Sequence, residues 1–377
     1  MEDSSPYFDF ELPTKFKFGP GKRSEIVSEI DRFGFKKVGV FTSPEVHDHG
    51  LLDDILTKLR EKSFALKIFT DVPRNPHLST VKKGYDHFKE YGPDCLIGLG
   101  GGSVIDTTKA VSLCLANGID DVTGLVDDAE RIAPSVPYFA LPTTSGTGSE
   151  VDYWAVISDP DSNRKISIGT PEMSPFAAIV DPELTTTLPP KLTFFTGIDA
   201  LSHSLEAFFS TGRNELTDTL AQKSIEKVFQ SLETAVKEGK NLEARGDMAL
   251  ASTLGGAAMQ HAGLGLVHAM SHQVSGFYDT SHGLANALLL PEVVDFNNKA
   301  VPGRLELLEE RIGLDIFAGL EELYGVIDLS ENQVEVKKEH LPEMAQRAAN
   351  NVNAKTNPRP AGVEEIQELY GEAFTVV

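Results

Sequence analysis

Short apolar runs alternate with amphipathic stretches through the first half of the chain. The runs are four to six residues long, and their β-branched and aromatic side chains are typical of buried strands. The stretches between them, such as 51–62 and 78–91, repeat apolar residues with a helical period. Strands that alternate with helices predict a mostly parallel sheet with both faces covered. The predicted strands are 37–42, 65–69, 95–99, 138–141 and 177–180.

The pattern changes after Asp181, where the Pro-rich segment LTTTLPPKLT precedes long helical repeats. The sequence therefore predicts an α/β domain at residues 1–187 and an all-helical domain at residues 188–377. In such a protein a ligand site in the cleft between the halves is the default expectation. The predicted helices of the second half are 196–210, 215–238, 242–260 and 266–275, with several more between 303 and 370.

Composition narrows the class of protein. Apolar residues make up 41% and charged residues 24% of the 377 residues, as in a folded globular protein, and no apolar run is long enough to span a membrane. The net charge of −22 argues against nucleic acid or an anionic membrane as a partner. Two cysteines, Cys95 and Cys114, are too few for a disulfide framework or a thiolate zinc site. The start shows no secretory signal, so we expect a cytoplasmic location.

A glycine turn follows the predicted strand 95–99, in the sequence CLIGLGGGSVID. Glycines let the backbone approach a phosphate, and the free N–H groups at a helix start favour an anion. Ser103 and Asp106 have the spacing of a capping box. The spacing is not that of the ordinary G-x-G-x-x-G fingerprint, and a simple chain reversal also needs glycine. Phosphate binding and a plain turn therefore both remain open for this segment.

A second segment rich in hydroxyl groups and glycine, LPTTSGTGSEV, follows the predicted strand 138–141. Small hydroxyl residues at the end of a strand suit a pyrophosphate or a cofactor amide in the crevice of an open α/β sheet. The alternative is a polar loop with Ser/Thr turns. Two such loops on one sheet favour a dinucleotide more than either does alone.

Five of the ten histidines lie between Asp199 and His282. Asp199 and His203 are four residues apart, as are His268 and His272, so each pair shares one helix face. Nitrogen and oxygen ligands without sulfur suit Zn²⁺ or Fe²⁺, and an open coordination position would make the site catalytic. Any one of these histidines alone would be read as a hydrogen-bonded core residue, whereas the set favours a metal site.

Taken together, these segments resemble the iron-containing, or group III metal-dependent, alcohol dehydrogenase family over nearly the whole chain. Several long motifs in the same order are more specific than any single one. The segment LPTKFKFGPG resembles the family's opening hairpin, VPRNP its Pro-Asn turn, GGGSVIDTTKA its pyrophosphate loop, LPTTSGTGSEV its second cofactor loop, and GIDALSHSLEAF, GLGLVHAMSH and SHG its metal helices.

The resemblance implies a dehydroquinate synthase-like fold, with an N-terminal nucleotide-binding domain and a C-terminal helical metal-binding domain. It implies an NAD(P)(H) oxidoreductase that interconverts a primary or small alcohol and its aldehyde. A divalent metal would polarise the carbonyl oxygen as hydride is transferred. Fe²⁺ is the implied metal, with Zn²⁺ or another divalent ion as an alternative, and a homodimer is the implied assembly.

The resemblance also assigns roles to individual residues. Beside the metal, we hypothesise that His272 relays a proton or tunes the ion, and simple packing is the alternative. The implied metal ligands are Asp199, His203, His268 and His282. The implied cofactor positions are Ser43, Asn75, Gly101, Gly102, Ser103, Asp106, Thr143, Thr144, Thr147 and Lys165.

The chain departs from the family pattern at several positions. Ser43 stands where many members have an Asp that would repel a 2′-phosphate, and no Arg or Lys is adjacent to it in the sequence, so we predict that NADP(H) is tolerated. Three further residues predict an unusual substrate pocket. Asp152 replaces the usual Thr and would disfavour a strongly anionic substrate, Trp154 follows it, and His261 replaces the common Asn. His261 would either meet a polar group of the substrate or bond to a nearby helix.

Other functions share this fold. Glycerol dehydrogenase, hydroxyacid-oxoacid transhydrogenase and maleylacetate reductase are alternatives, although the last typically lacks the full ligand set. A lyase of the dehydroquinate-synthase type needs an array of basic residues for a phosphorylated substrate, and no such array lies between Asp199 and His282. A nucleotide-binding protein that has lost catalysis is disfavoured because the four proposed ligands are intact.

Overall fold

The computed structural model describes residues 7–127, 132–329 and 332–377. The chain divides into two compact units. One is Glu11–Leu188, and the other is Pro189–Val377 together with the described residues that precede Glu11. The sequence placed all of 1–187 in one domain, whereas the structure assigns residues 7–10 to the helical unit.

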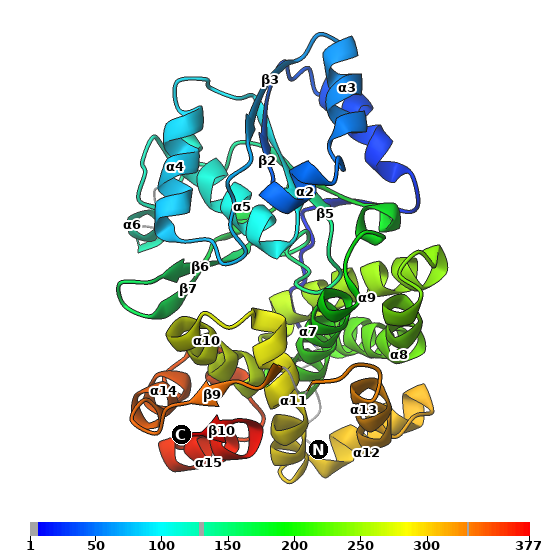
Figure 1. Cartoon of the computed structure of the whole chain (residues 1–377), viewed down its shortest axis with the longest axis vertical. Coiled ribbons are helices and arrows are strands. Elements are labelled where there is room, and N and C mark those ends of the chain that lie inside the picture. Colours follow the sequence, from blue (N-terminus) through cyan, green and yellow to red (C-terminus); the bar gives the residue numbers. More distant parts are fainter. Residues whose placement is uncertain (1–6, 128–131, 330–331) are drawn as a thin grey trace. The chain divides into compact units, whose positions relative to one another are not determined.

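A parallel sheet of six strands forms the centre of the α/β unit (Figure 1). Its strand order is β1-β8-β5-β4-β2-β3, and each neighbouring pair is parallel. The prediction of a mostly parallel sheet is therefore confirmed. The strands are β1 (Lys15–Phe18), β2 (Lys37–Phe41), β3 (Ala65–Phe69), β4 (Cys95–Gly100), β5 (Tyr138–Pro142) and β8 (Ala177–Val180).

The opening segment does not form the expected hairpin. Strand β1 lies at the edge of the sheet and pairs in parallel with β8, with Lys15 opposite Ala177. The hairpin of this unit comes later, where β6 (Trp154–Asp159) and β7 (Arg164–Gly169) pair antiparallel. Its turn contains Asn163 at a φ of 51°, a left-handed conformation that Asn tolerates better than most residues.

Helices cover both faces of the sheet, because its strands are apolar on both sides. Phe41 and Leu96 pack in one apolar cluster with residues of α4 and α5, whereas Val38 and Ile97 pack in another with residues of α1 and α3. Figure 1 shows α4 and α5 on one side of the strands and α3 on the other. The helices are α1 (Ile26–Arg32), α2 (Pro44–Asp48), α3 (Asp53–Glu61), α4 (Leu78–Phe88), α5 (Gly102–Asn117) and α6 (Val122–Asp127).

The strand order reverses direction between β2 and β4. From β2 the chain continues outward to β3, and from β4 it continues outward on the other side to β5. Ligands of open α/β sheets bind beyond the carboxyl ends of the strands at such a reversal. Ser43 follows β2, the Gly101–Gly102 turn follows β4, and Thr143 follows β5. The predicted cofactor segments thus share one edge of the sheet.

The second unit is built mainly of helices packed around an apolar core. A short parallel pair, β9 (Glu335–Val336) with β10 (Thr375–Val376), interrupts the otherwise helical pattern and was not predicted. No helix within the described ranges has the length and hydropathy of a membrane span. The helices are α7 (Pro190–Phe209), α8 (Glu215–Lys237), α9 (Leu242–Ala262), α10 (Leu266–Tyr278), α11 (His282–Asn298), α12 (Pro302–Ile312), α13 (Ile316–Tyr324), α14 (Leu341–Ala349) and α15 (Val363–Ala373).

The turn between α10 and α11 brings two predicted metal helices to a third. Asp279 adopts a left-handed conformation with a φ of 50° and ends α10, so that α11 begins three residues later at His282. The next residue, Gly283, lies so close to α7 that an added Cβ would be 2.6 Å from the carbonyl oxygen of Phe195. Only glycine permits this approach, which places the start of α11 against the helix that carries Asp199.

Candidate metal centre

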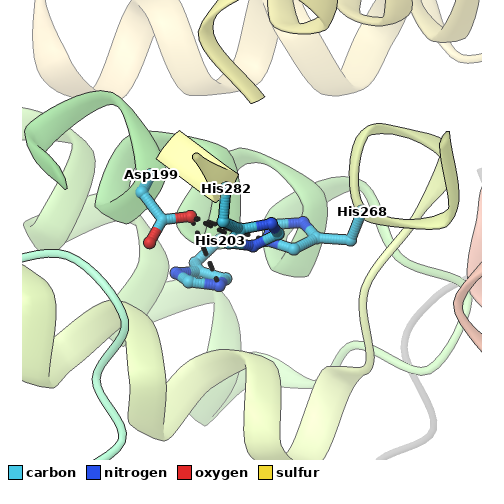
Figure 2. A group of neighbouring side chains, drawn as sticks. All are labelled: Asp199, His203, His268 and His282. Atoms are coloured by element: carbon cyan, nitrogen blue, oxygen red, sulfur yellow. Dashed lines mark ion pairs between the residues drawn. The ribbon is translucent and has the colours of Figure 1, made fainter. Parts of the chain in front are cut away.

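Four side chains of the helical unit point toward one another (Figure 2). Asp199 and His203 come from α7, His268 comes from α10, and His282 is the first residue of α11. Oδ1 of Asp199 lies 3.9, 3.8 and 3.6 Å from the Nε2 atoms of His203, His268 and His282, respectively. One donor atom from each residue lies within 4.8 Å of every other.

This spacing fits one metal ion. Ligand atoms at about 2.1 Å from a tetrahedral Zn²⁺ stand about 3.4 Å apart, so a small inward shift of these side chains completes the geometry. Asp199, His203 and His268 are buried, whereas His282 is partly exposed. The partial exposure of His282 is consistent with a site that admits a substrate.

The electrostatics of the cluster match a cation site. Burial opposes ionisation of Asp199, but the neighbouring His203 and His282 outweigh it and lower the pKa of the carboxyl group. Burial likewise lowers the pKa of His268, yet the nearby carboxylates of Glu206 and Asp199 raise it to about 9. The protein thus holds negative charge in a buried place, where a divalent cation offsets it.

Glu206 fixes the orientation of His268. Its Oε2 lies 2.6 Å from Nδ1 of His268, and its Oε1 accepts the backbone N–H of Val267 at 2.6 Å. A carboxylate in this position accepts a hydrogen bond from Nδ1–H, which leaves Nε2 to bind a metal. Glu206 follows His203 by three residues on α7, so the same helix supplies two proposed ligands and the group that orients a third.

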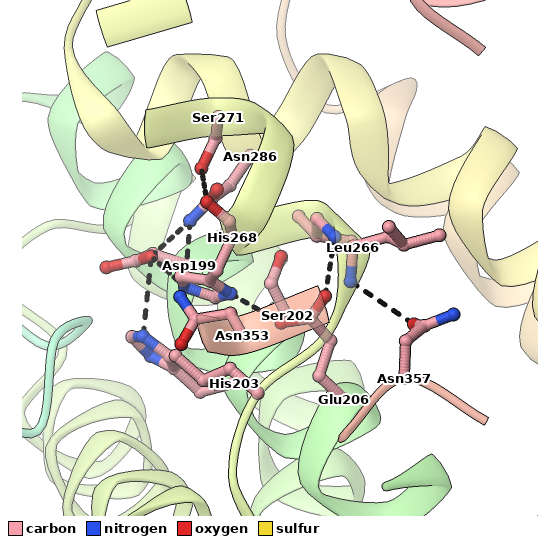
Figure 3. A network of polar contacts seen from close by, with 12 residues as sticks. Asp199, Ser202, His203, Glu206, Leu266, His268, Ser271, Asn286, Asn353 and Asn357 are labelled. Atoms are coloured by element: carbon pink, nitrogen blue, oxygen red, sulfur yellow. Dashed lines mark hydrogen bonds and ion pairs between the residues drawn. The ribbon is translucent and has the colours of Figure 1, made fainter. Parts of the chain in front are cut away.

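Asn286 lies inside the cluster (Figure 3). Its fully buried amide donates from Nδ2 to Oδ1 of Asp199 at 2.6 Å, and the same nitrogen lies 3.3 and 3.2 Å from Nε2 of His268 and His282. Its Oδ1 is buried and has no hydrogen-bond partner among the described residues. A buried amide with an unsatisfied oxygen beside four converging donors fits a cation site.

The donor set therefore fits a divalent metal. Three imidazole nitrogens and one carboxylate oxygen, with no sulfur, suit Fe²⁺ or Zn²⁺. Glu206 and Asn286 supply the outer hydrogen bonds that metal sites normally have. These four residues are the ligand set that the resemblance implied.

His272 lies beside the four donors but is not one of them. It is buried one helical turn after His268 on α10, and its ring centre is 5.3 Å from that of His282. This position agrees with either a proton-handling or a packing role.

In the α/β unit, the two predicted cofactor loops lie against each other. A Cβ added to Gly101 would be 3.2 Å from Cγ2 of Thr144, and one added to Gly102 would be 2.6 Å from Cγ2 of Thr147. Thr143 donates its backbone N–H to the carbonyl oxygen of Gly100 at 2.9 Å. Close packing against these threonines therefore explains the two glycines without reference to a phosphate.

Ser103 and Asp106 do not form the predicted capping box. Helix α5 begins without a side-chain cap; Ser103 instead donates to the carbonyl oxygen of Arg74, and Asp106 accepts the backbone N–H of Val156. The box fails because both side chains find partners in distant segments.

Elsewhere in this unit, Lys165 donates to Oδ1 of Asn75 at 3.3 Å, so these two predicted cofactor residues are in contact.

Ser43 caps the short helix α2 by accepting the N–H of Val46 at 3.3 Å. Glu45, two residues later, lies 3.6 Å from Nε of Arg74. The sequence showed no basic residue adjacent to Ser43, but the fold brings Arg74 next to its helix.

The three predicted pocket residues have protein partners. Asp152 is buried and pairs with Lys109 at 2.7 Å. Trp154 is partly exposed, begins β6 and covers Gly169. His261, at the end of α9, stacks on Phe10 with ring centres 4.0 Å apart.

Sequence reasoning missed Glu206, Asn286, Lys109 and Arg74. Two of them carried a usable signal: Glu206 is seven residues after Asp199, and Asn286 is four residues after His282, so each shares a helix face with a ligand. Lys109 and Arg74 gave no such signal, because their partners lie about 30 to 45 residues away in the chain.

Comparison with known proteins agrees with this architecture. Residues 13–182 match the family model described as iron-containing alcohol dehydrogenase, and residues 193–374 match its C-terminal counterpart. The chain is 36% identical to the NAD-dependent methanol dehydrogenase of Bacillus methanolicus over 97% of this chain and 100% of that protein. It is 34% identical to the lactaldehyde reductase of Escherichia coli, with coverage of 95% and 97%.

Solved structures agree as well. The structure of a 1,3-propanediol oxidoreductase superposes with a TM-score of 0.91 at 33% identity, covering 98% of this chain and 100% of that one. The fold and the four-donor cluster thus define a metal-dependent oxidoreductase with a nucleotide-binding unit. The chain belongs to the iron-containing alcohol dehydrogenase family. Its reaction is the interconversion of an alcohol and its aldehyde.

Proposed function

We propose that this chain acts on short aliphatic substrates, reducing an aldehyde to its primary alcohol or catalysing the reverse. The observation that carries the proposal is the convergence of Asp199, His203, His268 and His282 within 4.8 Å. The relatives named above act on methanol, lactaldehyde and 1,3-propanediol by their names, which supports a small substrate.

The four residues would hold a divalent ion, with Fe²⁺ as the first choice and Zn²⁺ as the second. Such an ion supplies a Lewis acid for the substrate oxygen. Glu206 and Asn286 would orient the ligands through their hydrogen bonds. His272, one helical turn after His268, would accept or deliver a proton. The pair of loops at Gly101–Gly102 and Thr143–Thr147 would hold the pyrophosphate of the dinucleotide.

For the cofactor, we propose that NADH is used and NADPH is tolerated. The neutral Ser43 does not repel a 2′-phosphate, and Arg74 lies close enough to Glu45 to offer a positive charge nearby. The negative charge of Glu45 opposes binding of the 2′-phosphate. The preference between NADH and NADPH therefore depends on whether Arg74 pairs with Glu45 or with the phosphate. The carboxylate of Glu45 can also accept a ribose hydroxyl, which supports the use of NADH.

We further propose a cytoplasmic homodimer. Cys95 and Cys114 are both buried and unpaired, and two unpaired thiols agree with a reducing compartment. The family resemblance supports the dimer, which light scattering of the purified protein would test.

The experiment that tests the function is a reconstitution assay. Metal-free protein is loaded with Fe²⁺ or Zn²⁺, and the absorbance of NADH or NADPH is followed with a panel of short aldehydes. We expect turnover with at least one metal, and none with His268→Ala, which removes a buried ligand. An absence of turnover for every metal, cofactor and aldehyde would overturn the proposal.

A further inference from the structure

A lysine is completely buried in the α/β unit. Lys109 lies on α5, seven residues after Gly102, and has no exposed surface. Its ammonium group donates to Oγ of Ser149 at 2.9 Å, to Oδ1 of Asp152 at 2.7 Å and to the carbonyl oxygen of Trp154 at 2.6 Å. All three ammonium protons thus have an acceptor, and all three acceptors belong to one segment of chain.

The same segment is bonded to α5 at a second point. Ser149 donates from Oγ to Oδ1 of Asp106 at 2.5 Å, and Val156 donates its backbone N–H to Oδ2 of Asp106 at 2.8 Å. Asp152 also accepts the backbone N–H of Trp154 at 2.8 Å. Residues 149–156 are therefore held on one helix by a continuous buried network.

This network, which we call the α5 clamp, consists of Asp106, Lys109, Ser149 and Asp152. The residues immediately before Ser149 carry the second cofactor loop, in which Thr144 and Thr147 pack against Gly101 and Gly102. Those glycines open the same helix to which the clamp is bonded. The clamp thus fixes the end of the threonine loop, two residues beyond Thr147, to the helix that follows the glycine turn.

Stability does not explain this arrangement. Desolvation of two buried charges commonly outweighs their attraction, so a buried pair is weak evidence for a stabilising role. Burial raises the pKa of Asp152 to about 6 even though Lys109 opposes the shift. Buried polar networks that are fully satisfied fix one geometry, and that is the property a two-loop cofactor site needs.

We propose that Asp152 is a positioning residue for the dinucleotide, acting through Lys109 to hold the threonine loop on the glycine turn, and not a group that meets the substrate. This inference rests on the proposed function, in which the two loops bind the cofactor. The position of Asp152, just after the second loop, suggested that this residue meets the substrate. Its carboxylate is instead buried and directed into the clamp.

The test uses the one tryptophan of the chain, Trp154, as the reporter. Its backbone donates to Asp152 and accepts from Lys109, and its ring is partly exposed, so its emission should respond when NADH binds. Titrating metal-loaded protein with NADH while following this emission gives a dissociation constant without any turnover. A failure of the proposed enzyme activity would therefore not prevent the measurement.

Asp152→Asn removes the charge and keeps the size of the side chain. We expect the dissociation constant for NADH to rise about tenfold, a loss of about 1.4 kcal/mol. At saturating NADH, the KM for the aldehyde and the metal content should be unchanged. Ser149→Ala, which removes the hydroxyl between Lys109 and Asp106 at constant charge, should weaken NADH binding in the same direction and guards against misfolding of the first variant.

Ser112→Ala is the matched control. Ser112 is equally buried on α5, and its hydroxyl donates to the backbone carbonyl of Lys109 at 2.9 Å, so loss of the hydroxyl leaves the side-chain bonds of the clamp intact. Its NADH affinity should equal that of the wild type. The proposal is overturned if Asp152→Asn binds NADH as tightly as the wild type, whether or not the KM for the aldehyde changes. It is also overturned if the control loses as much affinity as the clamp variants.

Discussion

Nδ1 of His268 lies 2.6 Å from Oε2 of Glu206, so a carboxylate holds the imidazole from the side opposite the other three proposed ligands. The other oxygen of Glu206 is bound to the N–H of Val267, which prevents the carboxylate from turning away. Carboxylates in this position fix the tautomer of a metal-binding histidine and increase its basicity. We therefore expect the metal affinity of this site to depend on Glu206 as well as on the four donors.

Glu206→Gln should lower the affinity for Zn²⁺ or Fe²⁺ by about 10- to 100-fold. The amide keeps the size of the side chain, but it holds the Nδ1 proton less strongly. The measurement is competition with a chelator, with metal content determined by mass spectrometry. Glu243→Gln, an exposed carboxylate in the first turn of α9, is the control and should retain wild-type affinity. Equal metal affinity in the two variants would show that Glu206 does not support the site.

Asn286→Ala should weaken the metal site by a different route. The amide is the hydrogen-bond donor that holds Oδ1 of Asp199, so its loss frees the carboxylate to rotate. Substitution of Co²⁺ for the native metal gives visible absorption bands that report ligand geometry. We expect these bands to shift and the metal affinity to fall by about tenfold or more. Asn298→Ala, at the far end of the same helix, should change neither; unchanged bands in Asn286→Ala would contradict the assignment.

The spacing of polar residues predicted part of the metal site because helices repeat every 3.6 residues. Asp199 and His203 fall on one face by that rule. The contact of that face with His268 and His282 is tertiary, and it depends on the left-handed Asp279 and on the close approach at Gly283. No local pattern encodes these contacts. The clustering of histidines indicated a metal site, and the resemblance then selected the four ligands from that set.

The α/β unit shows the same limit. Apolar runs predicted five of the six strands, namely the four interior strands and the edge strand β3. Strands that are buried on both faces need apolar side chains on both sides. The resemblance implied a hairpin for the segment that contains β1, but β1 pairs with β8. A short run with polar residues does not reveal which distant strand it pairs with. The ion pair of Asp152 with Lys109 could not be predicted, because Lys109 lies 43 positions away and no local pattern links the two residues.

We expect Arg74 and Glu45 to influence the preference between NADH and NADPH. Both side chains are largely exposed, and an exposed ion pair contributes less than about 1 kcal/mol, so a phosphate can displace Glu45 at little cost. Glu45→Gln should raise kcat/KM for NADPH relative to NADH by about fivefold, within that limit. Arg74→Ala should lower the same ratio. Paired initial-rate kinetics measure both, and a ratio unchanged by either variant would remove Arg74 from cofactor selection.

His272→Ala separates the two roles proposed for this histidine. If His272 relays a proton, kcat should fall by about 10²- to 10⁴-fold and the pH profile of kcat should lose one limb. If it only packs, the rate and its profile should stay near those of the wild type. Metal content must be measured alongside, since His272 lies next to His282. His340→Ala, a histidine paired with Tyr278 outside the cluster, is the control.

The pH dependence of stability tests the buried state of Asp152. The pKa of this carboxyl group is raised from 3.8 to about 6, first by burial and then by Asp106, against the opposing effect of Lys109. The folded protein therefore binds the proton more tightly than the unfolded chain does, and this group's contribution to stability is present at low pH and is lost as the pH rises through 6. From about pH 7 to about pH 5 the wild type should gain about 1 kcal/mol of unfolding free energy relative to Asp152→Asn. Urea unfolding of both proteins at the two pH values gives this difference. A difference of opposite sign would mean that Lys109 stabilises the ionised carboxylate by more than burial costs, and the clamp would then also act as a stabilising pair.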